Sequence, residues 1–461
     1  MAGPKHSCGV VGIKATYNVV PSLQRSLLVI QHRGQESAGL SVWNGEEILT
    51  VKNNGLVNVV LNDMTLSGVE GKAGIGHVRY STTGSKAPVN AQPLNVGTTL
   101  GTLSIAHNGD ITNFAVLKEQ YMKQGWSFLT DSDSEMIAKI ISKNISQSND
   151  VITAIKDTMK ELEGAYSLAI MVNDHVYGVR DPYGFRPLCI GRTEGGYIIV
   201  SESAALISLG AEFVRDVEPG EIVEIDSNSL IAYPPETKNS KAHCMFEWIY
   251  FARPDSVMDG RCVYDVRKNV GMILARESPA DVDLVMPVPD SGRAHAIGYA
   301  IVSGVPYEEG FMKNRFVDRT FILPEQSARE NAVSMKMNPI ASTIKDKRIL
   351  IVDDSIVRGT TLMKLIKMLK GAGAKEVHVR IGCPPVIAPC YYGVDMKSRD
   401  QFIATTHSIE EIRKAIGADS LAYISLKGLV EALGMPEDDL CLACVNNLYP
   451  TRIEGEKYRY D

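Results

Sequence analysis

The stretch KRILIVDDSIVRGTTL, Lys347 to Leu362, decides how the second half of the chain folds. Its first part, RILIV, is apolar and branched but too short for a helix, so it predicts a buried strand. Two carboxylates, Asp353 and Asp354, follow at the end of this strand, and then comes a turn of small and hydroxyl residues. The sequence TLMKLIKMLKGAG after the turn has helical spacing and stops at glycine. In an open α/β sheet, such a turn lies in the crevice beyond the strand ends, where ligands bind.

The turn predicts a ligand that carries both a phosphate and hydroxyl groups. Backbone N–H groups from Arg358 to Thr361, together with the two threonine hydroxyls, can surround a phosphate at the helix N-terminus. Gly359 allows the backbone to approach closely. Asp353 and Asp354 would repel a phosphate, so we expect them to meet hydroxyls or a metal ion. No G-x-x-x-x-G-K-[ST] occurs, which excludes a Walker-type P-loop. The alternative is a strand that ends in an ordinary acidic turn.

The composition is that of a soluble globular protein. The chain has 461 residues, enough for two or three domains with full cores, and 44% of them are hydrophobic. The net charge of −6, without a basic stripe, argues against nucleic acid and membrane surfaces as partners. No apolar run reaches membrane-spanning length, the start lacks a signal peptide, and the eight cysteines are scattered. These features predict a reducing, cytoplasmic location.

A polar segment with two prolines, YPPETKNSKA, divides the chain, and we expect a linker at residues 233–243. Beyond it, strand-like and helix-like stretches alternate. This alternation predicts an α/β domain with a parallel sheet over residues 244–461. Cys244 is expected to begin the first strand after the linker.

Five motifs precede the linker. Cys8 opens a strand-like CGVVGI, and four further motifs follow it: HRGQESAGL at 32–40, GIGHVRYSTTG at 74–84, SIAHNGDITN at 104–113 and TDSDSE at 130–135. In order and spacing they resemble the glutaminase domain of the N-terminal-nucleophile amidotransferases, over residues 8–232. The resemblance implies an αββα sandwich, in which two antiparallel sheets lie between layers of helices. The many short strand-like stretches agree with it, as do the helical stretches at 113–124, 133–144 and 151–162.

Cleavage of an amide needs a nucleophile, a base and a site for the oxyanion. The resemblance implies that Cys8 is the nucleophile, and that the Asn108 side chain and the Gly109 backbone N–H are the oxyanion donors. It further implies that Arg79 pairs with the glutamine α-carboxylate and that Asp133 accepts from the α-ammonium. Taken alone, a residue such as Arg79 or Asp133 would be a surface charge, so the roles rest on the set as a whole.

In that family the nucleophile is the first residue of the mature chain, and its α-amino group can act as the base. Cys8 is internal in this sequence. We therefore expect residues 1–7 to be a propeptide, removed by cleavage between Ser7 and Cys8.

VDDSIVRGTT resembles the phosphoribosyl-pyrophosphate loop of the type I phosphoribosyltransferases, in which the acidic pair holds the ribose hydroxyls. A second turn in this chain, PVPDSG at 287–292, matches the one that lies over the pyrophosphate in that family. The segment 310–340 is interpreted as a catalytic lid, with Lys313 and Arg315 neutralising the departing pyrophosphate; a solvated surface loop is the alternative. The resemblance implies Mg²⁺ as cofactor, held by Ser291, Asp353 and Asp354. The residues expected to bind phosphoribosyl pyrophosphate are Asp290, Ser291, Lys313, Arg315, Asp353, Asp354, Ser355, Arg358, Gly359, Thr360 and Thr361.

The cysteines of the second half form another candidate site. Cys441 and Cys444 form a C-x-x-C pair, and from the residues alone zinc and an iron–sulfur cluster both remain open. The contexts FARPDS, PCYYGVDM and C-x-x-C resemble the iron–sulfur branch of the glutamine phosphoribosylpyrophosphate amidotransferases. This implies one structural [4Fe–4S] cluster on Cys244, Cys390, Cys441 and Cys444. The other three cysteines of the chain besides Cys8 are expected to pack in the core; they are Cys189, Cys262 and Cys383.

Together the two halves predict one overall reaction. The glutaminase releases ammonia, and the transferase uses it to convert phosphoribosyl pyrophosphate into 5-phosphoribosylamine, with glutamate and pyrophosphate as the other products. This is the first step of de novo purine (IMP) synthesis. The resemblance also implies inhibition by purine nucleotides and a homo-oligomer, a dimer or tetramer.

One rival is an amidotransferase that makes glucosamine phosphate, which has no reason to carry VDDSIVRGTT. The other is a non-catalytic sensor, which would lack Cys8 and the lid and usually add a basic DNA-binding module.

Overall fold

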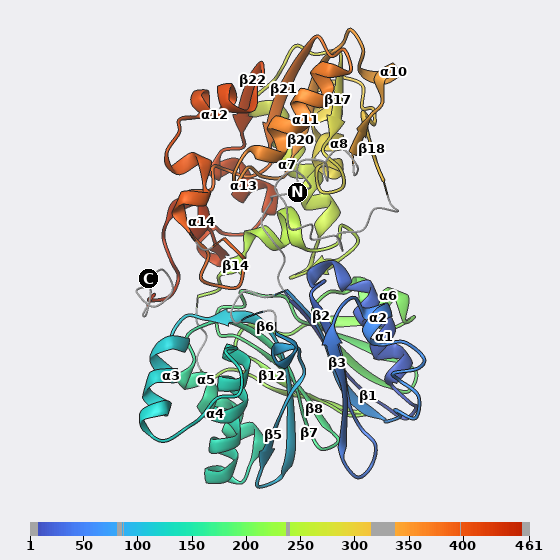
Figure 1. Ribbon diagram of the computed structural model, residues 1–461, viewed down its shortest axis with the longest axis vertical. Helices are drawn as coiled ribbons and strands as arrows, with labels where there is room; N and C mark the ends of the chain where they lie inside the picture. Colours follow the sequence, from blue (N-terminus) through green and yellow to red (C-terminus); the bar gives the residue numbers. More distant parts are fainter. Residues whose placement is uncertain are drawn as a thin grey trace.

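The computed structural model describes residues 8–80, 85, 87–236, 240–314, 337–396 and 398–453. The chain forms two lobes (Figure 1). The blue-to-green first half holds two large sheets, and the yellow-to-red second half holds a smaller parallel sheet with helices around it. The expected propeptide 1–7, the centre of the expected lid and Arg315 lie outside the described residues.

The first half contains two sheets whose strand pairs are all antiparallel. The seven-stranded sheet, in the order β11-β9-β10-β1-β4-β2-β3, consists of β1 (Gly9–Ala15), β2 (Ser37–Trp43), β3 (Ile48–Asn54), β4 (Ala73–Arg79), β9 (Cys189–Thr193), β10 (Gly196–Val200) and β11 (Glu212–Asp216). The six-stranded sheet, in the order β13-β12-β8-β7-β6-β5, consists of β5 (Leu94–Thr98), β6 (Gly101–Ile111), β7 (Gly164–Val172), β8 (His175–Arg180), β12 (Ile222–Ile225) and β13 (Leu230–Tyr233).

The inner faces of the two sheets share one core, in which Val10, Ile75, Ala106, Ala169 and Ile199 are fully buried. Helices cover both outer faces. The seven-stranded sheet is covered by α1 (Val20–Val29), α2 (Val57–Val60) and α6 (Ala204–Ser208), and the six-stranded sheet by α3 (Phe114–Lys123), α4 (Asp133–Ser148) and α5 (Val151–Glu161) (Figure 1). The three expected helical stretches are therefore confirmed, and the layers are those of the predicted αββα sandwich.

The second half is organised around a four-stranded parallel sheet in the order β17-β20-β21-β22. The predicted strand is β20 (Arg348–Asp353), and its apolar residues from Ile349 to Val352 are fully buried, as in a strand covered on both faces. The other strands are β17 (Leu284–Pro287), β21 (Glu376–Ile381) and β22 (Ser420–Tyr423), and the main helices are α7 (Val263–Glu277), α8 (Gly292–Ser303), α11 (Thr360–Gly371), α12 (Ile409–Ile416) and α13 (Leu426–Leu433). This confirms the predicted α/β architecture.

The join between the halves differs from the sequence expectation. Cys244 does not open a longer strand, because β14 is limited to His243–Cys244 and pairs with β23 (Leu440–Cys441). The next residues instead form a π-helical turn, η3 (Glu247–Phe251), which buries Trp248 and Phe251. An apolar and aromatic stretch fits either structure, and packing selected the helical turn. Within the described residues, no helix is long and apolar enough to span a membrane.

Candidate active sites

The first candidate site surrounds Cys8, which directly precedes β1 and is buried. Its Sγ donates a hydrogen bond to the carbonyl oxygen of Tyr80, at 3.4 Å, just past the end of β4. Burial raises the pKa of the Cys8 thiol, whereas the backbone of Tyr80 and the charge of Arg79 lower it. The net shift is upward, so a base must remove the proton before the sulfur can attack.

The charges of Arg79 and Asp133, which lie on two different elements, act on this thiol. Arg79 ends β4, is 3% exposed, and donates to the carbonyl oxygen of Ser85 at 3.1 Å. Asp133 is the first residue of α4, where a carboxylate is favoured by the helix dipole. Both charges act on Cys8, since Arg79 lowers the pKa of the thiol and Asp133 raises it. The structure thus brings a cation and an anion to one thiol, an arrangement that complements the two charged groups of an amino acid.

Asn108 and Gly109 are neighbours on β6, in the sheet that faces β1. Asn108 is fully buried, and neither its Oδ1 nor its Nδ2 has a hydrogen-bond partner in the part of the chain that the structure describes. A buried polar group without a partner costs about 1–3 kcal/mol, so this amide is suited to a ligand. Gly109 has φ +151°, and a Cβ there would lie 1.9 Å from the carbonyl oxygen of Ala165. Only glycine fits at this position.

The second candidate site is the acidic turn after β20. Asp353 and Asp354 are 8% and 5% exposed, and the backbone N–H of Asp354 donates to Asp353 Oδ1 at 2.9 Å. Burial raises the pKa of both carboxyl groups, and their mutual repulsion adds to the rise for Asp353. Ser291 and Ser355 donate hydroxyl hydrogen bonds to Asp354 at 2.5 and 2.6 Å. Two buried acids whose pKa values are raised fit a site for a divalent cation, which would supply the missing positive charge.

The turn after the acids leads into α11 as predicted. Gly359 precedes the helix with φ +73°, which favours glycine. Thr361 lines a cavity together with Ser291 and both acids. Tyr250, which the sequence did not single out, lines the same cavity. Arg358 is exposed and donates to Gln401 Oε1 at 2.5 Å.

Asp290 and Lys313 were expected to contact the same ligand, and the structure pairs them with each other. Asp290 also accepts from Arg293 at 2.7 Å. These groups are partly exposed, the Asp290 side chain by 54% and that of Lys313 by 34%. A pair of this kind is weak, so either partner can be released to a ligand at little cost.

The four cysteines expected to form one site act on one another electrostatically. Cys244 and Cys441 are register partners in the β14–β23 pair, and Cys444 lies in α14 (Ala443–Asn446). Burial raises the pKa of all four thiols, and at Cys444 the rise is increased first by Cys383 and then by Cys441, Cys390 and Cys244. Within the described ranges, no three His, Cys, Asp or Glu side chains are placed to hold one metal ion. The donor set is nevertheless all sulfur, which suits zinc or iron–sulfur chemistry.

Comparison with known proteins assigns the family. Residues 77–208 match a glutamine amidotransferase domain and residues 275–383 a phosphoribosyl transferase domain. An amidophosphoribosyltransferase of Methanocaldococcus jannaschii is 50% identical, with 98% of this chain and 99% of the relative covered. The chain belongs to the amidophosphoribosyltransferase family. The member from Bacillus subtilis is 42% identical over 98% of this chain and 95% of its own. A solved B. subtilis glutamine phosphoribosylpyrophosphate amidotransferase, complexed with ADP and GMP, matches with a TM-score of 0.91 over 97% of this chain and 98% of its own.

Membership in the amidophosphoribosyltransferase family confirms the predicted function. The chain is an enzyme of purine biosynthesis that transfers the amide nitrogen of glutamine to phosphoribosyl pyrophosphate. Neither rival fits this finding, because the match extends over both halves of the chain.

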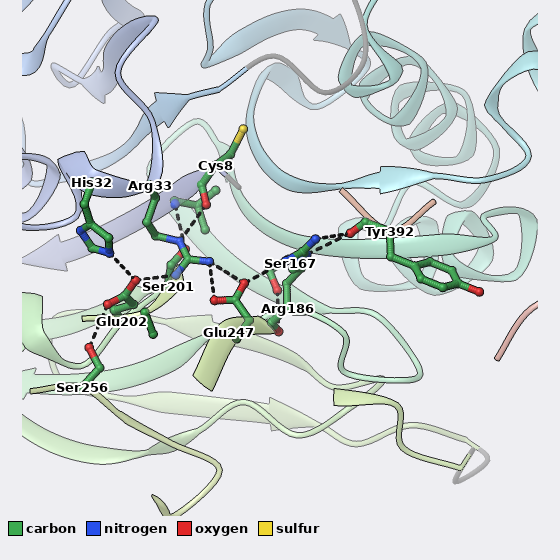
Figure 2. Close-up of polar contacts among 12 residues, drawn as sticks. Cys8, His32, Arg33, Ser167, Arg186, Ser201, Glu202, Glu247, Ser256 and Tyr392 are labelled. Carbon is green, nitrogen blue, oxygen red and sulfur yellow. Dashed lines mark hydrogen bonds and ion pairs between the residues drawn. The ribbon is translucent and has the colours of Figure 1, made fainter. Parts of the chain in front are cut away.

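Sequence reasoning missed a buried group of charged residues beside Cys8, formed by Arg33, Arg186, Glu202 and Glu247 (Figure 2). Arg33 does lie in the motif HRGQESAGL, and Arg186 follows phenylalanine in an apolar stretch. An arginine in such a setting indicates a buried ion pair, but the sequence does not show which acid is the partner. For Arg33 the partners are Glu202 and Glu247, which are 169 and 214 residues away. Pairing over that distance is decided by the fold.

Proposed function

We propose that the reaction runs in two half-sites, with glutamine cleaved at Cys8 and the ammonia used at Asp353 and Asp354. Two observations support the assignment of residues. Asn108 presents a buried amide whose polar atoms have no partner among the described residues. The acid pair is buried with raised pKa values, which suits binding of a cation or of hydroxyl groups.

In the first half-site, cleavage between Ser7 and Cys8 frees the α-amino group of Cys8, which then takes the thiol proton. The sulfur attacks the amide carbonyl, and Asn108 Nδ2 and the Gly109 N–H stabilise the oxyanion. The amine passes its proton to the departing nitrogen, so that ammonia leaves and a thioester remains. Water then hydrolyses the thioester to glutamate. Arg79 and Asp133 hold the α-carboxylate and α-ammonium throughout.

In the second half-site, the backbone from Arg358 to Thr361 binds the 5-phosphate with the Thr360 and Thr361 hydroxyls, and Asp353 and Asp354 bind the ribose diol. Ser291 and the two acids can hold Mg²⁺, with Ser355 orienting Asp354. When bound, Mg²⁺ screens the charge of the pyrophosphate leaving group. Ammonia attacks the anomeric carbon as the C–O bond to pyrophosphate breaks. Lys313 leaves its pair with Asp290 and joins Arg315 at the pyrophosphate, while residues 310–340 close over the site.

The cysteine site is proposed to hold one [4Fe–4S] cluster on Cys244, Cys390, Cys441 and Cys444. Four thiols are the ligands that such a cluster takes, and soft sulfur ligands suit iron–sulfur chemistry. Its role is structural, because these residues tie the C-terminal segment to the strand that opens the second half.

The remaining assignments concern domains and partners. We propose a propeptide at 1–7, a glutaminase domain at 8–232, a linker at 233–243 and a transferase domain at 244–461. We also propose that the enzyme is cytoplasmic, assembles as a homo-oligomer, and is inhibited by purine nucleotides. The last point is supported by the B. subtilis structure, which was solved with ADP and GMP.

One assay tests the two half-sites. Pyrophosphate release from phosphoribosyl pyrophosphate is measured with glutamine, with ammonia and with neither, for the wild type, Cys8→Ala and Asp353→Asn/Asp354→Asn. Cys8→Ala should lose the glutamine reaction and keep the ammonia reaction, and the double variant should lose both. A Cys8→Ala enzyme that still uses glutamine would overturn the first half-site, and wild-type product formation by the double variant would overturn the second.

A further inference from the structure

Arg33 holds the main chain of Cys8 by a hydrogen bond, and buried ion pairs hold Arg33 in place. Its Nε donates to the carbonyl oxygen of Cys8 at 3.0 Å, and its remaining N–H groups pair with Glu202 and Glu247 (Figure 2). The three charged side chains are at most 2% exposed. Figure 2 shows the Cys8 sulfur pointing away from these ion pairs. They fix the backbone of residue 8, and its reactive atom lies on the side that faces away from them.

Glu247 is shared between two arginines. Its Oε1 and Oε2 accept from Arg33 at 2.7 and 2.9 Å, and its Oε1 also accepts from Arg186 at 3.0 Å. Arg186 then donates through Nε and Nη2 to the carbonyl oxygen of Tyr392, at 2.9 and 2.6 Å. The Glu247 carboxylate, at the start of η3, thus joins Arg33 through Arg186 to the turn that contains Tyr392.

The turn that Arg186 holds packs on the strand of the oxyanion donors. A Cβ built on Gly393, next to Tyr392, would lie 3.0 Å from the carbonyl carbon of Gly109. The Tyr392 ring also stacks on Phe185, with ring centroids 4.1 Å apart. A continuous set of contacts therefore runs from Cys8 through the two arginines to the backbone of Gly109.

We propose that Glu247 is a positioning residue that sets the place of the Cys8 thiol relative to Asn108 and Gly109. The inference rests on the proposed role of Cys8 as nucleophile. Arg33 contacts the carbonyl oxygen of Cys8 and not its amide nitrogen, so removal of residues 1–7 leaves the contact intact. Replacing Glu247 by Gln keeps the size of the side chain but leaves two buried guanidinium groups without their shared charge. The main chain of Cys8 is then free to shift.

The test uses the full-length enzyme with Glu247→Gln, and compares two alkylation rates of Cys8 with the kinetics of glutamine hydrolysis. A glutamine-like chloroketone must dock before it reacts, whereas iodoacetamide needs only an accessible thiol. A shift of the thiol by about 1 Å should lower kcat about 30-fold or more and lower the chloroketone rate about 10-fold. The KM for glutamine and the iodoacetamide rate should stay within about threefold, because Arg79 and Asp133 are untouched.

Glu221→Gln is the matched control, since it breaks a buried carboxylate's pair with Arg215 (2.7 Å) away from Cys8. It should leave both alkylation rates unchanged. If Glu247→Gln does not fold, Arg186→Lys takes its place. It keeps the charge but loses the two-fold contact to Tyr392, and it should also lower the chloroketone rate. A Glu247→Gln enzyme with wild-type kcat and chloroketone rate overturns the proposal, as does a parallel fall of both alkylation rates. Failure of the proposed nucleophile is distinguishable, because Cys8→Ala would then still hydrolyse glutamine.

Discussion

Ser291 donates a hydrogen bond from Oγ to Asp354 Oδ1 at 2.5 Å, and so joins the start of α8 to the end of β20. Ser291 and Asp354 stand in two different turns, 63 residues apart in sequence. Neighbouring parallel strands β17 and β20 end at the same edge of the sheet, which brings the turns together. The bond favours the charged form of Asp354, against the effect of burial, and this charge is what a cation or a diol requires.

Ser291→Ala should weaken binding of phosphoribosyl pyrophosphate with Mg²⁺. A hydrogen bond to a charged group contributes about 1.5–3 kcal/mol, so we expect the KM of the ammonia reaction to rise about 10- to 100-fold. Initial rates of pyrophosphate release measure it. Ser303→Ala, at the other end of α8, removes a hydroxyl that bonds the backbone of Ala300 and Val305 and should leave KM unchanged. An unaltered KM in Ser291→Ala would contradict the proposed ligand set.

Asn108→Ala should lose activity without losing stability. Removing one oxyanion donor lowers kcat for glutamine hydrolysis by about 10²–10³. The substitution also removes a buried amide that has no partner among the described residues, so the denaturation midpoint should not fall. Initial rates of glutamine hydrolysis measure kcat, and urea titrations measure the denaturation midpoint.

Asn144→Ala provides the comparison, because Asn144 is also buried but donates to Thr158 Oγ1 at 3.0 Å. This variant should lose about 1–2 kcal/mol of unfolding free energy and keep its glutaminase activity. If Asn108→Ala were the less stable of the two and still active, Asn108 would be a structural residue.

Asp216 makes folding depend on pH. It lies at the end of β11, and burial together with the nearby Asp259 carboxylate raises its pKa from 3.8 to about 7. Between these values the folded chain holds a proton that the unfolded chain has lost, so stability falls as the pH rises from about 4 to about 7. The effect amounts to at most ~4 kcal/mol.

Asp216→Asn should remove this dependence. The variant is expected to lie close to the wild type near pH 4 and to be more stable at pH 8, as measured by urea unfolding at both pH values. Asp63→Asn, at an exposed position, controls for the change in net charge. A stability difference between Asp216→Asn and wild type that stays constant from pH 4 to 8 would contradict the assignment.

Cys244→Ser should lose the bound iron, because it removes one of four proposed cluster ligands. Protein purified without oxygen is analysed for iron, sulfide and zinc. Cys383→Ser is the matched control, since Cys383 is buried and acts electrostatically on Cys444 but is not a proposed ligand. It should keep its full iron content. Zinc without iron in the wild-type protein would contradict the cluster.

Much of the fold could be predicted because the deciding signals are local. The strand at 348–353 and the helix from Thr360 follow from apolar runs, a glycine and the spacing of hydrophobic residues. The candidate site was harder to predict in detail. The sequence suggested that Lys313 and Asp290 share a ligand, but not that they pair with each other. Exposed charges can choose among several partners of similar energy, and local sequence does not decide among them.

Local patterns are enough to predict the αββα and α/β halves, the motifs around Cys8 and the acidic turn, and the family resemblance that named the reaction. Which distant groups meet depends on the packed fold: Arg33 with Glu247, Arg186 with Tyr392, and Gly393 against Gly109. The physical reason is burial. A guanidinium removed from water must find a carboxylate wherever the packed fold brings one, and that partner can lie more than two hundred residues away.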